Sequence, residues 1–312
     1  MGGRATAEVT AAEFTALFES VRTWGRWGAQ DQRGAINRLD AKSTMIAARL
    51  VRSGRVVSLA LPLKTTRGPE CPEPAQFRMT QGHDTDAGLG ELTFAKDFVG
   101  VDYHNDGHSH IDALSHVSYR GTLYNGVAAG SVTERGASLE GIDAVKDGLV
   151  GRGVLLDIPR SRGVAWIEPG EHVFAEDLKL AQREQRVDVQ QGDIVLVRTG
   201  HTRHLAELGP WDTASSKAGL HPTAMPPLAD RGIVALGCDG NSDTAPSSTE
   251  GVPFPIHVLA LNAIGMLLLD YLNLEDLADA CASQRRWEFM CVTAPLRVVG
   301  GTGSPVNPLA IL

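Results

Sequence analysis

Four of the ten histidines of this 312-residue chain lie within thirteen consecutive positions, and two aspartates lie among them. The six residues are His104, Asp106, His108, His110, Asp112 and His116. Apolar residues at 98–101 precede them and predict a strand, in which the residues from His104 to Asp112 at a spacing of two share one face. Such a row of imidazoles and carboxylates is costly to bury unless a partner neutralises it. Zn²⁺ and Mn²⁺ take both kinds of ligand, so the spacing predicts a metal site.

A structural explanation of these histidines has to be weighed against a metal site. A lone histidine is usually a core or surface residue, and a histidine-rich tract can be a solvated loop that picks up metal without purpose. The regular spacing of two residues, followed by His116 four positions after Asp112, favours a functional site. We therefore expect a divalent metal ion, Zn²⁺ or Mn²⁺, as the cofactor.

Residues 109–112 (Ser-His-Ile-Asp) and His116 resemble the second half of a signature of the cyclase family, which includes bacterial kynurenine formamidases and isatin hydrolase. That signature reads His-x-Gly-Thr-His-x-Asp-x-Pro-x-His. The first half differs here, because Asp106 stands at the first histidine and His108 at the glycine. A second family pattern, His-x-x-Gly-His-x-His-x-Asp, matches the sequence from His104. His104, Asp106 and His108 all remain candidates for the last ligand, and His108 is preferred.

The resemblance extends over nearly the whole chain. Further matching residues are Trp27, Gly28, Asp31, Gln32, Gly34, Tyr119, 123–126 and 300–305. By resemblance, His257 corresponds to a histidine that faces the metal, and Asp270 takes the place of a carboxylate thirteen residues later. The family also implies a swivelling β/β/α-type domain with a small barrel-like mixed sheet surrounded by helices. It implies a homo-oligomer as well, either a dimer or a tetramer.

The pattern of apolar residues predicts a mixed α/β fold. Apolar runs at 153–158, 194–198, 233–237 and 289–299 predict strands, and helical segments separate them. A capping box at Thr10 opens an expected helix over 10–23. Residues 64–93 are rich in Thr, Gly, Pro and charge, which predicts a long loop able to close over a substrate. We expect an N-terminal helical arm over 1–54, packed on a catalytic domain over 55–312.

Composition narrows the classes of partner. The net charge of −8 argues against nucleic acid, and no apolar run approaches the ~18 residues that a membrane helix needs. The four cysteines are scattered singly and the N-terminus lacks the apolar core of a signal peptide, so we expect a cytoplasmic protein. The expected partner is therefore a small-molecule substrate.

The expected chemistry is metal-assisted hydrolysis. His108, His110 and Asp112 would hold the ion, which activates a water molecule that His116 deprotonates. His257 would orient the substrate or bind a second ion. By resemblance, the bond attacked is an amide, lactam or lactone in a small, often aromatic, molecule. A metal-dependent cyclase or dehydratase and a non-catalytic metal-binding module are the alternatives.

Overall fold

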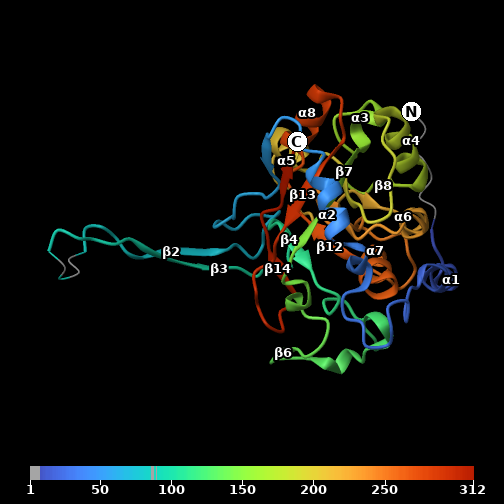
Figure 1. Ribbon diagram of the computed structural model, residues 1–312, viewed down its shortest axis with the longest axis horizontal. Helices are drawn as coiled ribbons and strands as arrows, with labels where there is room; N and C mark the ends of the chain where they lie inside the picture. Colours follow the sequence, from blue (N-terminus) through green and yellow to red (C-terminus); the bar gives the residue numbers. More distant parts are fainter. Residues whose placement is uncertain (1–7, 86–87, 89) are drawn as a thin grey trace.

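A nine-stranded mixed sheet forms the centre of the computed structural model, which describes residues 8–85, 88 and 90–312 (Figure 1). The strand order is β1-β15-β13-β7-β9-β11-β12-β4-β14, and the sheet is strongly curled into a half-barrel. The strands are β1 Val56–Ser58, β4 His110–Asp112, β7 Leu149–Asp157, β9 Ile194–Arg198, β11 Ala235–Cys238, β12 Leu267–Asp270, β13 Glu288–Thr293, β14 Gly303–Pro305 and β15 Leu309–Ile311. Three two-stranded sheets pair β2 Gln76–Gln81 with β3 Lys96–Gly100, β5 Val132–Thr133 with β6 Gly136–Ala137, and β8 His172–Val173 with β10 Gly219–Leu220.

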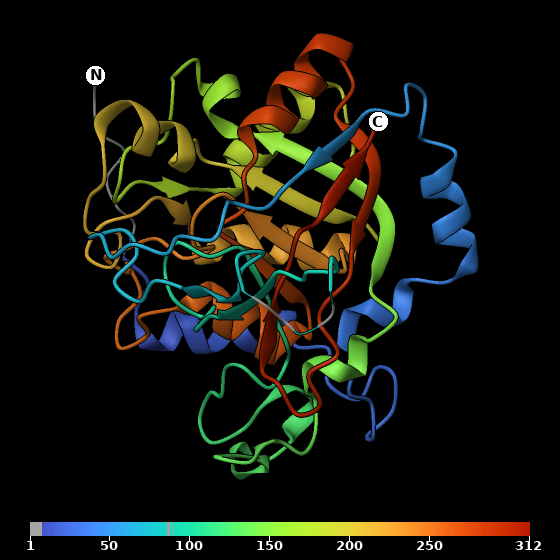
Figure 2. The same cartoon turned by 90° about the vertical axis from the view of Figure 1, so that its left-hand side faces the viewer.

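Helices surround the sheet, as the views in Figures 1 and 2 show. The α-helices are α1 Ala11–Val21, α2 Ala41–Ala48, α3 Ile158–Arg162, α4 Ala175–Gln185, α5 His201–Leu208, α6 Met225–Arg231, α7 Pro255–His257 and α8 Glu275–Gln284. Helix α7 continues into the π-helix η6 Val258–Ile264. Short 3₁₀ helices are η1 Gly34–Arg38, η2 Tyr124–Gly126, η3 Ala129–Ser131, η4 Ile142–Val145 and η5 Pro222–Ala224. None of the helices in the described ranges is long and apolar enough to cross a membrane.

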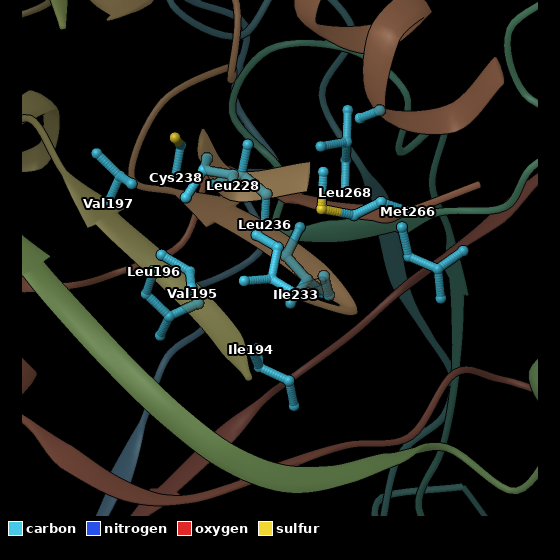
Figure 3. Close-up of a cluster of buried hydrophobic side chains, with 14 of the residues drawn as sticks. Ile194, Val195, Leu196, Val197, Leu228, Ile233, Leu236, Cys238, Met266 and Leu268 are labelled. Atoms are coloured by element: carbon cyan, nitrogen blue, oxygen red, sulfur yellow. The ribbon is translucent and has the colours of Figure 1, made fainter. Parts of the chain in front are cut away.

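The core lies around the parallel strands β7, β9, β11 and β12 (Figure 3). Every residue of β9, β11 and β12 is buried, because helices and neighbouring strands cover both faces. Strands covered on both sides are expected to be continuous apolar runs, and this is how the sequence predicted them. The mixed α/β fold is therefore confirmed, and the run at 194–198 coincides with β9.

The N-terminal segment contributes to the same core. Helix α1 begins with the expected capping box, in which the Thr10 side chain accepts from the Glu13 amide and Glu13 reaches back to the Thr10 amide. Its buried face, formed by Phe14, Phe18 and Val21, joins the main hydrophobic cluster. The division into an arm over 1–54 and a catalytic domain over 55–312 stays a prediction.

Two expectations about local structure were wrong. The histidine-rich segment is a strand only over His110–Asp112, because Gly107 adopts a left-handed conformation (φ +100°) and turns the chain before it. The five-residue row on one strand face is therefore not formed. Residues 64–93 are also not a continuous loop, because β2 lies within them and pairs with β3 in a ribbon that projects from the body (Figure 1).

Truncating Leu236 should measure how strongly the central strands hold the fold. Leu236 is fully buried on β11 between Val195 and Leu268 of the neighbouring strands. We expect Leu236→Ala to lower the free energy of unfolding by about 2–5 kcal/mol, through lost burial and the cavity left behind. Urea denaturation measures this change. Leu208→Ala, at an exposed position on α5, is the control and should have little effect.

Candidate metal centre

Strand β4 places two of the predicted ligands on one face. His110 and Asp112 are two residues apart and point together, while Ile111 between them is buried in the core. The antiparallel neighbour β12 sets Asp270 directly opposite His110. A strand of only three residues can hold these side chains firmly because β12 and β14 flank it on both edges.

Three imidazoles converge on the Asp112 carboxylate. His104 Nδ1 lies 2.9 Å from Asp112 Oδ1, and His110 Nε2 lies 3.6 Å from the same oxygen. His257 Nε2 lies 3.5 Å from Asp112 Oδ2 and 3.5 Å from Asp270 Oδ2. His116 stacks face to face on His104, with 3.9 Å between ring centroids. Two groups of possible ligands result, His104–His110–Asp112 and Asp112–His116–His257, and Asp112 belongs to both.

The outer nitrogens of these imidazoles have fixed partners. His110 Nδ1 lies 2.8 Å from the carbonyl oxygen of His108, which can only accept, so Nδ1 carries the hydrogen and Nε2 is left to face Asp112. His257 Nδ1 lies 2.6 Å from Asp243 Oδ2 and directs its own Nε2 toward Asp112 and Asp270. Partners of this kind orient the histidines that bind metals in proteins.

The glycine-rich stretch near the C-terminus positions His104. Thr302 Oγ1 lies 3.0 Å from His104 Nε2, on the side of the ring away from Asp112. A β-carbon at Gly303 would lie 2.7 Å from the His104 ring and 2.5 Å from the Ile111 carbonyl oxygen, so only glycine fits. This close approach lets β14 pair with β4 while His104 occupies the site.

Sequence reasoning missed Asp243 and Ser242, which lie in a turn between β11 and α7. Asp243 accepts hydrogen bonds from the amides of Ile256 and His257, so it caps α7 while it orients the His257 ring. Ser242 Oγ donates to Asp270 Oδ1 at 2.6 Å and leaves Oδ2 to face the cluster. No local spacing signals these roles, since 14 and 28 residues separate the partners.

Burial and charge perturb the titration of these groups. Burial acts to raise the pKa of Asp112, but the neighbouring His116 and His110 outweigh it and hold this pKa well below its usual value. Burial acts to lower the pKa of His257, but Asp112 and Asp243 outweigh it and raise this pKa well above its usual value. Burial raises the pKa of Asp270. Strong shifts of opposite direction at one place are typical of functional sites.

The donor set fits a divalent cation. Both oxygens of Asp112, Oδ2 of Asp270 and Nδ1 of His104 are buried and make no hydrogen bond with adequate geometry. Buried carboxylate oxygens without a donor are costly, and imidazole with carboxylate is a ligand set of Zn²⁺ and Mn²⁺. His104, His110, Asp112, His257 and Asp270 are the residues that would hold the ion.

Two of the predicted ligands lie outside this cluster. The His108 ring turns away, with Nε2 3.2 Å from the carbonyl oxygen of Glu73 and 3.7 Å from Cys71 Sγ. Asp106 instead pairs with Lys217 at 3.1 Å and accepts hydrogen bonds from Thr213 and Tyr271. The preference for His108 therefore finds no support in the geometry, because the turn at Gly107 places His104 beside Asp112.

Substituting Asp106 tests whether its carboxylate serves a structural ion pair with Lys217 or binds the metal ion. Lys217 is buried, so Asp106→Asn leaves its ammonium without a counter-charge, and we expect a loss of about 3–5 kcal/mol in unfolding free energy. The double variant Asp106→Asn/Lys217→Met should recover most of this loss. Urea denaturation gives the stabilities, and metal analysis of the folded double variant should show unchanged metal content. Loss of metal in that double variant would indicate that Asp106 is a metal ligand.

A cavity of about 450 Å³ opens beside the cluster. Three of its lining residues are the histidines His104, His116 and His257, and most of the others are apolar. The others are Val117, Ser118, Tyr119, Asn241, Gly251, Val252, Pro253, Phe254 and Val258. Phe14 and Phe18 of α1 contact Tyr119 from behind, so the N-terminal helix supports this wall. A mostly apolar pocket with a few polar groups at one end is typical of a small-molecule site.

Comparison with known proteins agrees with this architecture. Residues 47–243 match the model of the family described as Putative cyclase. A crystal structure described as that of a novel cyclase is 31% identical, with a TM-score of 0.86 over 95% of this chain and 99% of that chain. The chain belongs to this cyclase family.

More distant solved structures share the fold. An isatin hydrolase bound to the product analogue thioisatinate has a TM-score of 0.60 at 20% identity, over 88% of this chain and 99% of that chain. A predicted metal-dependent hydrolase from Bacillus stearothermophilus has a TM-score of 0.51 at 20% identity, over 82% of this chain and 97% of that chain. No curated protein matches the chain.

Proposed function

We propose that this protein is a metal-dependent hydrolase that cleaves an amide, lactam or lactone bond of a small apolar or aromatic molecule in the cytoplasm. The observation that supports it most is the convergence of four imidazoles and two buried carboxylates beside an apolar cavity. Zn²⁺ or Mn²⁺, when bound, supplies activation of a water molecule and polarisation of the substrate carbonyl. The protein supplies the ligands, the pocket and the proton transfer.

His116 is the residue we assign to proton transfer. It lines the cavity, and its ring is held parallel to that of His104. Burial lowers the pKa of His116 to about 4 against the opposing charge of Asp112, so the imidazole is neutral near pH 7 and can accept a proton. In this role it takes the proton of the attacking water and returns it to the leaving group.

The cavity favours a largely apolar substrate that carries a carbonyl group at the end facing the histidines. Phe254 and Tyr119 offer aromatic contact, and Asn241 lies among the few polar residues of the lining. One structural neighbour is an isatin hydrolase bound to thioisatinate. Isatin, an aromatic lactam, is therefore the first substrate to test.

Turnover by the metal-loaded protein tests the proposal. Isatin, dihydrocoumarin and formanilide represent lactams, lactones and formamides, and mass spectrometry of the products identifies the reaction. Hydrolysis of a ring adds one water to the substrate mass and hydrolysis of formanilide releases formate, and either result supports the proposal. Loss of water or rearrangement without a gain of mass would instead favour a cyclase or dehydratase. Bound metal with no turnover of any candidate would favour a non-catalytic metal-binding module.

A further inference from the structure

A buried glutamate outside the metal centre lacks a partner for its side chain. Glu140 lies two residues before η4 and is only 1% exposed. Both oxygens of its carboxyl group are buried, and neither makes a hydrogen bond with a described residue. Burying a carboxylate without donors is costly, and polar groups inside folded proteins nearly always have a partner. The side chain of Glu140 therefore needs a partner that the described residues do not supply.

The backbone around Glu140 is held from both sides. Glu140 has a left-handed conformation (φ +59°), which is uncommon for a residue other than glycine. Its amide donates to Oε1 of Gln32 at 3.0 Å, and its carbonyl oxygen accepts from the amide of Ser115 at 3.2 Å. These two contacts fix the conformation that directs the carboxyl group into the interior.

The charged group that acts on Glu140 is a second carboxylate. Burial, and then the negative charge of Asp31, raise the pKa of Glu140 to about 8. No lysine or arginine of the described residues offsets the charge of Glu140. Asp31 itself accepts hydrogen bonds from the amide of Gly34 and from Asn37 Nδ2, which hold it in place. Two neighbouring carboxyl groups thus share a region that contains no positive charge of its own.

Two buried hydroxyl groups add further oxygen atoms to this region. Tyr124 is fully buried, and its Oη makes no hydrogen bond of adequate geometry within the described ranges. It lies beside both carboxyl groups, because the charges of Asp31 and Glu140 act with burial to raise the pKa of Tyr124. Ser115, whose amide contacts Glu140, has a buried Oγ that also lacks a partner among the described residues. Donor sets made only of oxygen suit hard cations.

We propose that Glu140 is the main ligand of a second cation site, separate from the metal centre, that takes a hard cation such as Ca²⁺, Mg²⁺, Na⁺ or K⁺. Asp31, Tyr124 and Ser115 are the neighbours whose oxygens can join it. The cation neutralises the buried carboxylate and ties the segment before η1 to the turn at 113–116, which carries His116. This site does not rest on the proposed hydrolase function.

The melting temperature of the protein in different salts tests the site. Chlorides of the four cations are compared with tetramethylammonium chloride at equal ionic strength, with Zn²⁺ held constant so that the metal centre contributes equally. We expect one of the four to raise Tm by about 4 °C when present at about a hundred times its dissociation constant. Glu140→Gln keeps the size of the side chain but not its charge, so it should fold and lose this gain.

Glu134→Gln is the matched control, because it makes the same change at an exposed position of the same segment. It should keep the full response to the cation. A parent that responds to none of the four cations, or a response that survives in Glu140→Gln or disappears in Glu134→Gln, would overturn the proposal. Absence of turnover with every candidate substrate would count against the hydrolase proposal alone.

The dependence of stability on pH separates a bound cation from a buried neutral acid. A carboxyl group whose pKa is raised on folding stabilises the protein below its unfolded pKa, and this contribution is lost as the pH rises to the folded pKa. Without a cation, the parent should therefore lose stability relative to Glu140→Gln between pH 4.5 and about 8. The bound cation should suppress this loss. The same loss in every salt would show that Glu140 is a neutral acid, and the cation site would be refuted.

Discussion

Asp112→Asn is expected to lower metal affinity by more than about 100-fold, because loss of a ligand should exceed the loss caused by removing a supporting contact. Asp112 belongs to both groups of possible ligands, so the binding of one ion or of two ions would depend on its carboxylate. Asparagine keeps the size of the side chain but lacks the charge that balances the surrounding imidazoles. Metal content after gel filtration and calorimetric titration with Zn²⁺ and Mn²⁺ measure the change.

Asp279→Asn, an exposed position on α8, is the matched control for Asp112→Asn. It removes the same charge from a residue outside both groups of possible ligands, and it should bind metal as the parent does. A folded Asp112→Asn protein that keeps parental metal affinity would contradict the ligand assignment. Unfolding of the variant is checked separately by circular dichroism.

His116→Ala is expected to lower kcat by about 10²–10⁴-fold, the usual contribution of a general acid–base residue. Metal affinity should stay close to that of the parent, because His104, His110, Asp112, His257 and Asp270 remain to hold the ion. Steady-state kinetics on the best substrate and metal analysis of the same sample make the comparison.

Metal analysis decides between the two roles open to His116. Besides its assigned role in proton transfer, His116 belongs to the group of possible ligands that contains Asp112 and His257. Loss of one equivalent of metal in His116→Ala would make it a ligand, and unchanged kcat would remove it from the mechanism. His204→Ala changes a histidine that makes an edge-to-face contact with Trp211 outside the cluster, and it should keep parental kinetics.

The sequence predicted the parallel part of the fold well, because strands covered on both faces have to be continuously apolar. The runs at 194–198 and 233–237 show this directly. It placed a strand at 98–101, which overlaps β3, but it did not predict β2, whose apolar residues Phe77 and Met79 are exposed. Two apolar residues in an otherwise polar segment are too weak a strand signal to distinguish β2 from the loop around it.

In the candidate site too, the residues that are close together in sequence were predicted, and the partners that are distant in sequence were not. His110 and Asp112 were predicted from spacing on a strand, and the structure places both in the cluster. The same spacing argument misplaced His108, because strand periodicity stops at the turn formed by Gly107. Asp243 and Thr302 were not predicted, since their partners are 14 and 198 residues away and only the sheet brings them together.

Strand β4 lies between neighbours that are synthesised much later than itself. Residues 110–112 leave the ribosome early, whereas β12 and β14 follow at 267–270 and 303–305. A growing chain therefore holds its histidine-rich segment without β12 until residue 270 is made and without β14 until residue 305 is made, and contacts this distant in sequence form slowly. Ion capture should accordingly follow the synthesis of β14, and a chain that ends before residue 303 should be unable to retain the ion.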